Sequence, residues 1–379
     1  MSERTIYLDY NATTPVLPEV AEAMLPYFTD HFGNPSSSHW FGQRARDAVE
    51  QARAQVAELL GASPAEIIFT SGGTESNNLA IRGVAEAIAD RRHVVTSVIE
   101  HPAVARPCAH LEKLGWKITQ LGVDAAGRVI LAQAESAIGS ETALVTVMHA
   151  NNETGTLHPI ERLSAIARAR GALIHTDAAQ SAGKIPVRVD ELNVDLLSVA
   201  GHKLYAPKGI GALYVRKGTS LKPLLLGAGH ERGLRPGTEN VPYIIGLGKA
   251  CAIAEASISL ELQRVRELRD LLWQLLRRAI PGLRLNGHAE QRLPNTLNVR
   301  FPGARGTMVL AMCPQLAAST GSACHEGGES PSQVITAMGI EPQEALGSVR
   351  LTLGRYTNEE DIRRAAAALC AGWQRARKA

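Results

Sequence analysis

The sequence is poor in aromatic residues and in net charge, and both features exclude classes of function. Phe, Trp and Tyr make up 4% of the 379 residues, too few for the stacking platforms that bind single-stranded nucleic acids. Lys and Arg number 40 against 37 Asp and Glu, which leaves a net charge of +3 and no dense basic run. The composition therefore argues against a nucleic-acid-binding protein.

Cysteine and long apolar runs are scarce as well. The 5 cysteines are widely spaced without a C-x-x-C pair, which argues against a disulfide framework and a structural zinc site. The first residues, MSERTIYLDYNATTP, lack the apolar stretch of a secretory signal, and no uninterrupted run of about eighteen apolar residues predicts a membrane span. We expect a cytoplasmic protein with reduced thiols, no metal site and no membrane contact.

The middle of the sequence alternates short apolar runs with amphipathic stretches. The pattern predicts strands at residues 66–70, 93–97, 144–148, 173–176, 195–199 and 211–215, and helices at 76–89, 102–114 and 159–170 between them. Such alternation predicts an α/β fold with a large, mostly parallel sheet.

Both ends of the sequence have a different pattern. A helical run begins near Pro18, a long charged helix extends from about Ser257 to Pro281, strand-like segments follow at 295–300 and 348–353, and a closing helix begins at Asn358. We expect a large α/β domain over residues 16–256 and a smaller α+β domain formed by residues 1–15 and 257–379.

A glycine pair marks the first candidate site. The segment Ser71-Gly72-Gly73-Thr74-Glu75-Ser76 follows a predicted strand and opens a helix. The free N–H groups of a helix N-terminus favour a phosphate group, so Gly73 and Thr74 predict a phosphate cradle. An ordinary turn with Ser71 or Thr74 as the helix N-cap explains the same residues equally well.

Two further candidate residues follow predicted strands. Asp177, in HTDAAQ, suits a helix N-cap, a metal ligand or a partner for a protonated ring nitrogen. Lys203, in GHKLYAPKG, suits either a nucleophilic amine with a lowered pKa or a surface turn. Together, a phosphate cradle, an acid and an amine are the groups that a pyridoxal phosphate enzyme must supply.

Cys324 is unlike the other cysteines. It lies in ASTGSACHEGGES, among small and polar residues with little to bury, whereas Cys251 lies in the apolar segment KACAIA. An exposed position is typical of a reactive thiol. A metal ligand cluster with the adjacent His325 is the less favoured interpretation, because adjacent residues rarely reach one metal ion.

These segments resemble the cysteine desulfurases of the NifS/IscS type, which are class V, fold-type I pyridoxal phosphate enzymes. The similarity covers almost the whole chain and includes YLDYNATTPV, TSGGTESNNLAI, MHANNETG, HTDAAQ, GHKLYAPKGIGALYVR, GHERGLRPGTEN, GSAC and VRLTLGRYT. The selenocysteine lyases share most of these motifs and are the close relatives to weigh.

The resemblance implies a role for each site residue. Lys203 would bind the cofactor covalently, Asp177 would pair with its ring nitrogen, Gln180 would bind its ring oxygen, and His101 would stack on the ring and assist proton transfer. The phosphate would be held by Gly73, Thr74 and His202, with Thr238 reaching in from a partner subunit. Asn152, which also counts among the cofactor-binding residues, and Arg350 would bind the substrate carboxylate, and Cys324 would accept the sulfur.

The resemblance also implies a reaction and partners. L-cysteine would be converted to L-alanine while its sulfur forms a persulfide on Cys324, for iron–sulfur clusters or thiolated products. The enzyme would be a homodimer that passes sulfur to an acceptor protein.

Three features depart from the IscS pattern. Ala200 stands where relatives usually have a phosphate-contacting serine, and both this change and His325 favour a selenocysteine lyase, as does RLPNTLN at 292–298. The spacing from Cys324 to Pro331 favours a desulfurase. A non-catalytic sulfur carrier and a generic aminotransferase are the remaining alternatives.

Overall fold

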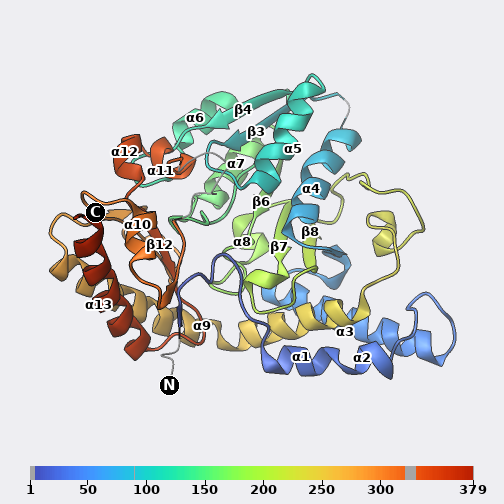
Figure 1. Ribbon diagram of the computed structural model, residues 1–379. Helices are drawn as coiled ribbons and strands as arrows, with labels where there is room; N and C mark the ends of the chain where they lie inside the picture. Colours follow the sequence, from blue (N-terminus) through green and yellow to red (C-terminus); the bar gives the residue numbers. More distant parts are fainter. Residues whose placement is uncertain (1–4, 89, 321–329, 379) are drawn as a thin grey trace.

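The computed structural model describes residues 5–88, 90–320 and 330–378, and Cys324 lies outside the described residues. Its largest element is a seven-stranded sheet in the order β2-β8-β7-β6-β5-β3-β4 (Figure 1). The strands are β2 (Ile67–Thr70), β3 (His93–Ser97), β4 (Lys117–Leu121), β5 (Thr142–Thr146), β6 (Leu173–Asp177), β7 (Leu196–Ala200) and β8 (Gly211–Val215). Only β8 runs antiparallel to its neighbours, so the expected mostly parallel α/β sheet is confirmed.

Apolar side chains cover both faces of this sheet. Successive strand residues alternate between two hydrophobic cores: Ile68 and Val94 join one core, whereas Ile67 and Val95 join the other. Helices α4 (Gly73–Ala87) and α5 (Pro102–Lys113) supply the first core. The second core is built with α1 (Pro18–Met24), α3 (Trp40–Leu60), α7 (Ile160–Ala169) and α9 (Val241–Ala279). Burial on both faces explains why these strands are continuous apolar runs.

A smaller unit surrounds a second, antiparallel sheet, β12-β10-β9. Its strands are β9 (Arg284–Asn286), β10 (Thr296–Arg300) and β12 (Ser348–Thr352), and its helices include α10 (Gly306–Ala311) and α13 (Glu359–Ala376). The N-terminal strand β1 (Ile6–Tyr7) pairs in parallel with β11 (Leu316–Ala317), so the chain begins in this unit. Short helices complete the described fold: α2 (Pro26–Thr29), α6 (Leu131–Ala137), α8 (Val189–Leu192), α11 (Gln333–Ala337) and α12 (Pro342–Ala345).

Helix α9 connects the two units along the base of the molecule (Figure 1). Its first half packs in the large core through residues such as Leu247, and its second half packs in the small core through residues such as Leu272. The expected start of this helix at Ser257 was wrong, because α9 begins at Val241. The first half is apolar and glycine-containing rather than amphipathic, so its sequence lacks the helical period. The predicted domain boundaries remain a prediction.

Among the described helices, α9 alone has the length and apolar composition that a membrane span requires. Its apolar residues nevertheless contribute to both hydrophobic cores. Of the apolar stretch that meets this requirement, 39% is buried inside the protein.

Three other elements differ from the sequence expectation. Strand β5 covers Thr142–Thr146, two residues earlier than predicted, and α3 was not predicted as an element of its own. Strand β4 was missed because its sequence, KITQL, is half polar at the edge of the sheet. An exposed edge strand needs less apolar character than a central one.

Gly248 allows α9 to approach α3 closely. A Cβ atom at this position would lie 2.6 Å from both the Cα and the Cβ atom of Ala52, which is closer than carbon atoms can pack. We therefore expect Gly248→Ala to lower the free energy of unfolding by about 1–3 kcal/mol through overpacking, measured by urea denaturation. Gly229→Ala is the control, because its Cβ atom meets open space. A Gly248→Ala protein at least as stable as the control would contradict this packing.

Candidate active site

A cavity of about 420 Å³ lies where the carboxyl ends of β6 and β7 face the start of α4 and strand β12. It is lined by every predicted site residue except Cys324 and Thr238, namely Gly73, Thr74, His101, Asn152, Asp177, Gln180, His202, Lys203 and Arg350. Parallel α/β sheets bind ligands at this edge, where successive strands end. Residues far apart in the sequence are thus brought together in one place.

Lys203 ends a 3₁₀ turn, Gly201–Lys203, directly after β7. Its Nζ atom donates hydrogen bonds to the carbonyl oxygens of Asn11, at 2.7 Å, and Ala12, at 2.6 Å. Burial and the nearby Arg350 charge lower the pKa of Lys203 to about 8, although Asp9 and Asp177 act in the opposite direction. Near neutral pH a minority of this amine is therefore uncharged and available as a nucleophile, far more than for an ordinary lysine.

Asp177 is the last residue of β6 and its carboxylate is held from two sides. Asn77 Nδ2 donates to Oδ2 at 2.7 Å, and the backbone N–H of Ala179 donates to Oδ1 at 2.9 Å. The N-cap interpretation is wrong, since α8 begins only at Val189. Among the described residues, no group of three His, Cys, Asp or Glu side chains could hold a metal ion. The carboxylate is therefore fixed at the cavity wall, where it can pair with a cationic ligand group.

Helix α4 begins at the cavity without a side-chain cap. Its N-cap residue is Gly72, with φ of 148°, a backbone conformation that favours glycine. The predicted capping by Ser71 or Thr74 was wrong, so the first N–H groups of a 15-residue helix remain available to a ligand. A Cβ atom on Gly73 would lie 3.1 Å from the Cβ of Ala200, which leaves glycine the best fit there. This arrangement fits an anionic group such as phosphate.

His202 lies beside this helix terminus. Burial, reinforced by Lys203 and other nearby cations, lowers the pKa of His202 to about 4, so the ring is neutral. Its Nδ1 atom is 3.1 Å from Thr13 Oγ1. The second ring nitrogen, Nε2, is therefore the one available to a ligand.

His101 is the N-cap of α5, and its Nδ1 atom accepts the backbone N–H of Ala103 at 3.1 Å. Burial lowers the pKa of His101, with Lys203 adding to the shift and Asp177 opposing it. A neutral ring whose Nδ1 accepts a hydrogen bond carries its proton on Nε2. His101 can therefore offer an N–H group at the cavity.

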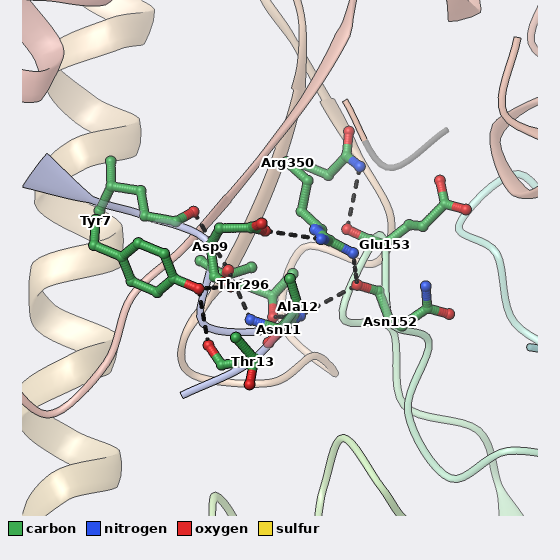
Figure 2. Close-up of polar contacts among 12 residues, drawn as sticks. Tyr7, Asp9, Asn11, Ala12, Thr13, Asn152, Glu153, Thr296 and Arg350 are labelled. Carbon is green, nitrogen blue, oxygen red and sulfur yellow. Dashed lines mark hydrogen bonds and ion pairs between the residues drawn. The ribbon is translucent and has the colours of Figure 1, made fainter. Parts of the chain in front are cut away.

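Arg350, on β12, belongs to the smaller unit but reaches the same cavity (Figure 2). Its two terminal nitrogens donate to the Asn152 carbonyl oxygen at 3.1 Å and to Asp9 Oδ1 at 2.8 Å. Its Nε atom is buried and has no partner among the described residues. These contacts fix a guanidinium at the cavity, where it can bind a carboxylate.

Residues 6–365 match the family model described as aminotransferase class-V. The chain belongs to the class-V aminotransferase family. Its curated relatives include the cysteine desulfurase IscS of Dictyoglomus turgidum, 49% identical over 363 residues, which are 95% of this chain and 92% of that protein. A cysteine desulfurase of Trichormus azollae is also 49% identical, over 361 residues that are 95% of this chain and 90% of that protein.

Solved structures of other proteins are also similar to this class-V family member. A NifS-like protein has a TM-score of 0.91 and 37% identity, covering 97% of this chain and 98% of its own. SspA in complex with cysteine has a TM-score of 0.82 and 40% identity, covering 93% of this chain and 100% of its own. The expected fold class is confirmed.

Asn11 also belongs to the site of this class-V family member, although it was not identified from the sequence. Its backbone oxygen accepts from Lys203, and its Nδ2 donates to the Asn152 carbonyl oxygen at 3.2 Å and to Thr296 Oγ1 at 2.9 Å (Figure 2). The motif YLDYNATTPV carried the resemblance, but no pattern in it assigns a role to one asparagine. The N-terminal loop that contains Asn11 forms part of the cavity wall.

Two buried carboxyl groups beside the cavity were also missed. Burial raises the pKa of Glu100 to about 8 and that of Glu153 to about 7. Glu100 accepts from the Met148 backbone N–H at 3.1 Å, and Glu153 accepts from Ser332 Oγ at 2.5 Å. Glu100 directly precedes His101 in the sequence, and Glu153 directly follows Asn152, and both of these neighbours line the cavity. No sequence pattern distinguishes the two glutamates from glutamates on the surface.

Thr238 lies away from this cavity, exposed on the loop between β8 and α9. The loop is anchored by Glu231, which forms a buried bidentate ion pair with Arg53 at 2.7 and 2.9 Å. Farther along, Arg235 Nε contacts Glu75 Oε1 at 3.0 Å, beside the start of α4. The loop is therefore fixed near the helix terminus, with Thr238 facing outwards.

The lowered pKa of Lys203 has a measurable consequence. The ammonium form dominates below about pH 8 and the reactive amine above it, so acylation of Lys203 in the cofactor-free protein should rise with a midpoint near pH 8. The same residue in denatured protein should show the ordinary lysine midpoint near pH 10.4. Mass spectrometry of the Lys203 peptide measures both curves, and identical midpoints would contradict the assigned environment.

Proposed function

We propose that this protein is a pyridoxal phosphate-dependent cysteine desulfurase that converts L-cysteine to L-alanine and transfers the sulfur to Cys324. One observation carries the proposal: an amine, a fixed carboxylate, an uncapped helix terminus and a guanidinium converge on one cavity. The relatives named cysteine desulfurase, at 49% identity over 95% of the chain, support the substrate and the reaction.

The cavity fits the cofactor group by group. The start of α4, with Thr74 and the neutral His202, suits the phosphate. The carboxylate of Asp177 suits a protonated ring nitrogen, and His101 suits the ring face. The amine of Lys203 suits covalent attachment. When bound, pyridoxal phosphate withdraws electrons from the substrate's α-carbon.

The side chains of the protein then bind the substrate and transfer its proton and its sulfur. Arg350 and Asn152 bind the substrate carboxylate and thereby orient the α-carbon towards Lys203. The amine of Lys203, in the uncharged form that its lowered pKa makes accessible near neutral pH, accepts the α-proton at Nζ. The Cys324 thiolate attacks the substrate sulfur, the carbon–sulfur bond breaks, and its electron pair stays with the carbon skeleton, which takes up two protons, one of them from Lys203 Nζ, and leaves as alanine. The products are L-alanine and a Cys324 persulfide.

Selenocysteine lyase is the second candidate, favoured by Ala200. The buried methyl group of Ala200 faces Gly73, where relatives of the IscS kind usually place a serine hydroxyl near the phosphate. Conversion of L-selenocysteine with rejection of L-cysteine would favour this function over the first.

Three further proposals follow from the desulfurase assignment. The protein acts as a homodimer in which Thr238 reaches the partner's phosphate site, since Thr238 is exposed on an anchored loop beside α4. It passes sulfur to an acceptor protein. It does so in the cytoplasm.

Alanine formation from L-cysteine, in the presence of a reductant, tests the function. We expect Lys203→Ala to abolish turnover, and Cys324→Ala to keep the yellow cofactor while losing desulfuration. Lys208→Ala and Cys370→Ala are the matched controls and should remain active, because neither residue lines the cavity. A colourless Cys324→Ala protein, or one that desulfurates normally, would contradict the proposal.

Complementation tests the dimer. Thr238→Ala should bind pyridoxal phosphate about tenfold more weakly, as expected for one lost hydrogen bond to a charged group. At a pyridoxal phosphate concentration too low to saturate Thr238→Ala, mixing it with inactive Lys203→Ala protein should restore activity, since one site of each mixed dimer then has both intact residues. A fully active monomer by light scattering would contradict the shared site.

A further inference from the structure

Lys184 lies four residues after Gln180, between the active-site cavity and a narrow, largely apolar pocket. That pocket includes Leu17, Ile253 and Gly183 in its lining, together with Lys184 itself. Burial, with the nearby charges of Lys203 and Arg350, holds the pKa of Lys184 well below its ordinary value. No ion pair of Lys184 with a carboxylate occurs in the described part of the chain. A lysine in such a place calls for a role other than charge pairing.

The amine of Lys184 contacts two side-chain carbonyl groups. Nζ donates to Gln180 Oε1 at 2.9 Å and to Asn11 Oδ1 at 3.1 Å. A lysine amine donates hydrogen bonds here whether it is charged or neutral, because even the neutral form has two N–H groups for these two acceptors. In the structure, the oxygen of each carboxamide faces Lys184.

This contact with Lys184 sets how Gln180 presents its amide in the structure. With Oε1 held by Lys184, the NH₂ group lies on the other side, where one hydrogen reaches the Asn11 carbonyl oxygen at 3.1 Å. Gln180 lines the active-site cavity and is buried. The second hydrogen of its NH₂ group is thus left for a ligand in the cavity.

Asn11 depends less on Lys184 than Gln180 does. Asn11 Oδ1 also accepts from Asn295 Nδ2 at 3.0 Å, and its own NH₂ group has separate partners. For Gln180 Oε1, Lys184 is the only donor among the hydrogen bonds of the described residues. Loss of the lysine amine would therefore release mainly Gln180.

We propose that Lys184 is a positioning residue that holds the Gln180 carboxamide with its NH₂ group towards the active-site cavity, where it donates a hydrogen bond to the ring oxygen of the cofactor. The inference rests on the proposed pyridoxal phosphate chemistry. Lys184 acts on the site through Gln180 and does not contact the substrate.

The test uses Lys184→Met, which keeps the length and apolar stem of the side chain and removes the amine. Gln180→Ala and the double variant complete a mutant cycle, and Lys113→Met is the control for removal of an exposed lysine. Equilibrium binding of pyridoxal phosphate and the pH midpoint of the bound cofactor's visible absorbance are measured, with thermal unfolding of each cofactor-free protein.

We expect Lys184→Met and Gln180→Ala each to weaken pyridoxal phosphate binding about tenfold. Both should raise the absorbance midpoint, because an N–H donor stabilises the anionic ring oxygen. The double variant should be no weaker than Gln180→Ala alone, and Lys113→Met should match the wild type.

Losses that multiply in the double variant, to about a hundredfold, would overturn the positioning role, as would an unchanged midpoint in Lys184→Met. If Lys184→Met does not fold, Lys184→Gln takes its place in the same cycle, since its shorter side chain cannot reach both acceptors. A wild-type protein that binds no pyridoxal phosphate would instead overturn the proposed function itself.

Discussion

The active site depends on the contacts of one buried asparagine, Asn11, which is 1% exposed. Its backbone N–H donates to Thr352 Oγ1 at 3.0 Å in the smaller unit, and its backbone oxygen accepts from Lys203 in the larger one. Its side chain reaches the Asn152 carbonyl oxygen and Thr296. Because these partners come from both units, Asn11 fixes the position of β12, and hence of Arg350, relative to the end of β7 (Figure 2).

The charges around the cavity follow a single arrangement. Arg350 and the largely protonated Lys203 face it as cations, while the raised pKa values of Glu100 and Glu153 keep two nearby carboxyl groups largely protonated below neutral pH. Asp177 is the carboxylate that lines the cavity itself. A site of this kind favours ligands that carry phosphate and carboxylate groups and leaves one defined place for a protonated ring nitrogen.

The sequence predicted the sheet and most of the cavity because each signal was local. Short apolar runs located the buried strands, and Asp177, Lys203 and Gly73 were found from their places directly after a strand or before a helix. The first half of α9 escaped prediction because apolar residues occupy its half-buried positions as well as its buried ones, while Gly246 and Gly248 lower helix propensity where neighbouring helices pack closely. Asn11 and Glu153 escaped because their contacts join residues at large sequence separations.

The most direct test of the account is the fate of the substrate's sulfur. After addition of L-cysteine without reductant, mass spectrometry should find the peptide containing Cys324 heavier by one sulfur atom, with L-alanine formed in equal amount. The same peptide from Lys203→Ala should be unchanged. Alanine formed without sulfur on Cys324, or sulfur on Cys324 in the Lys203→Ala protein, would contradict the account.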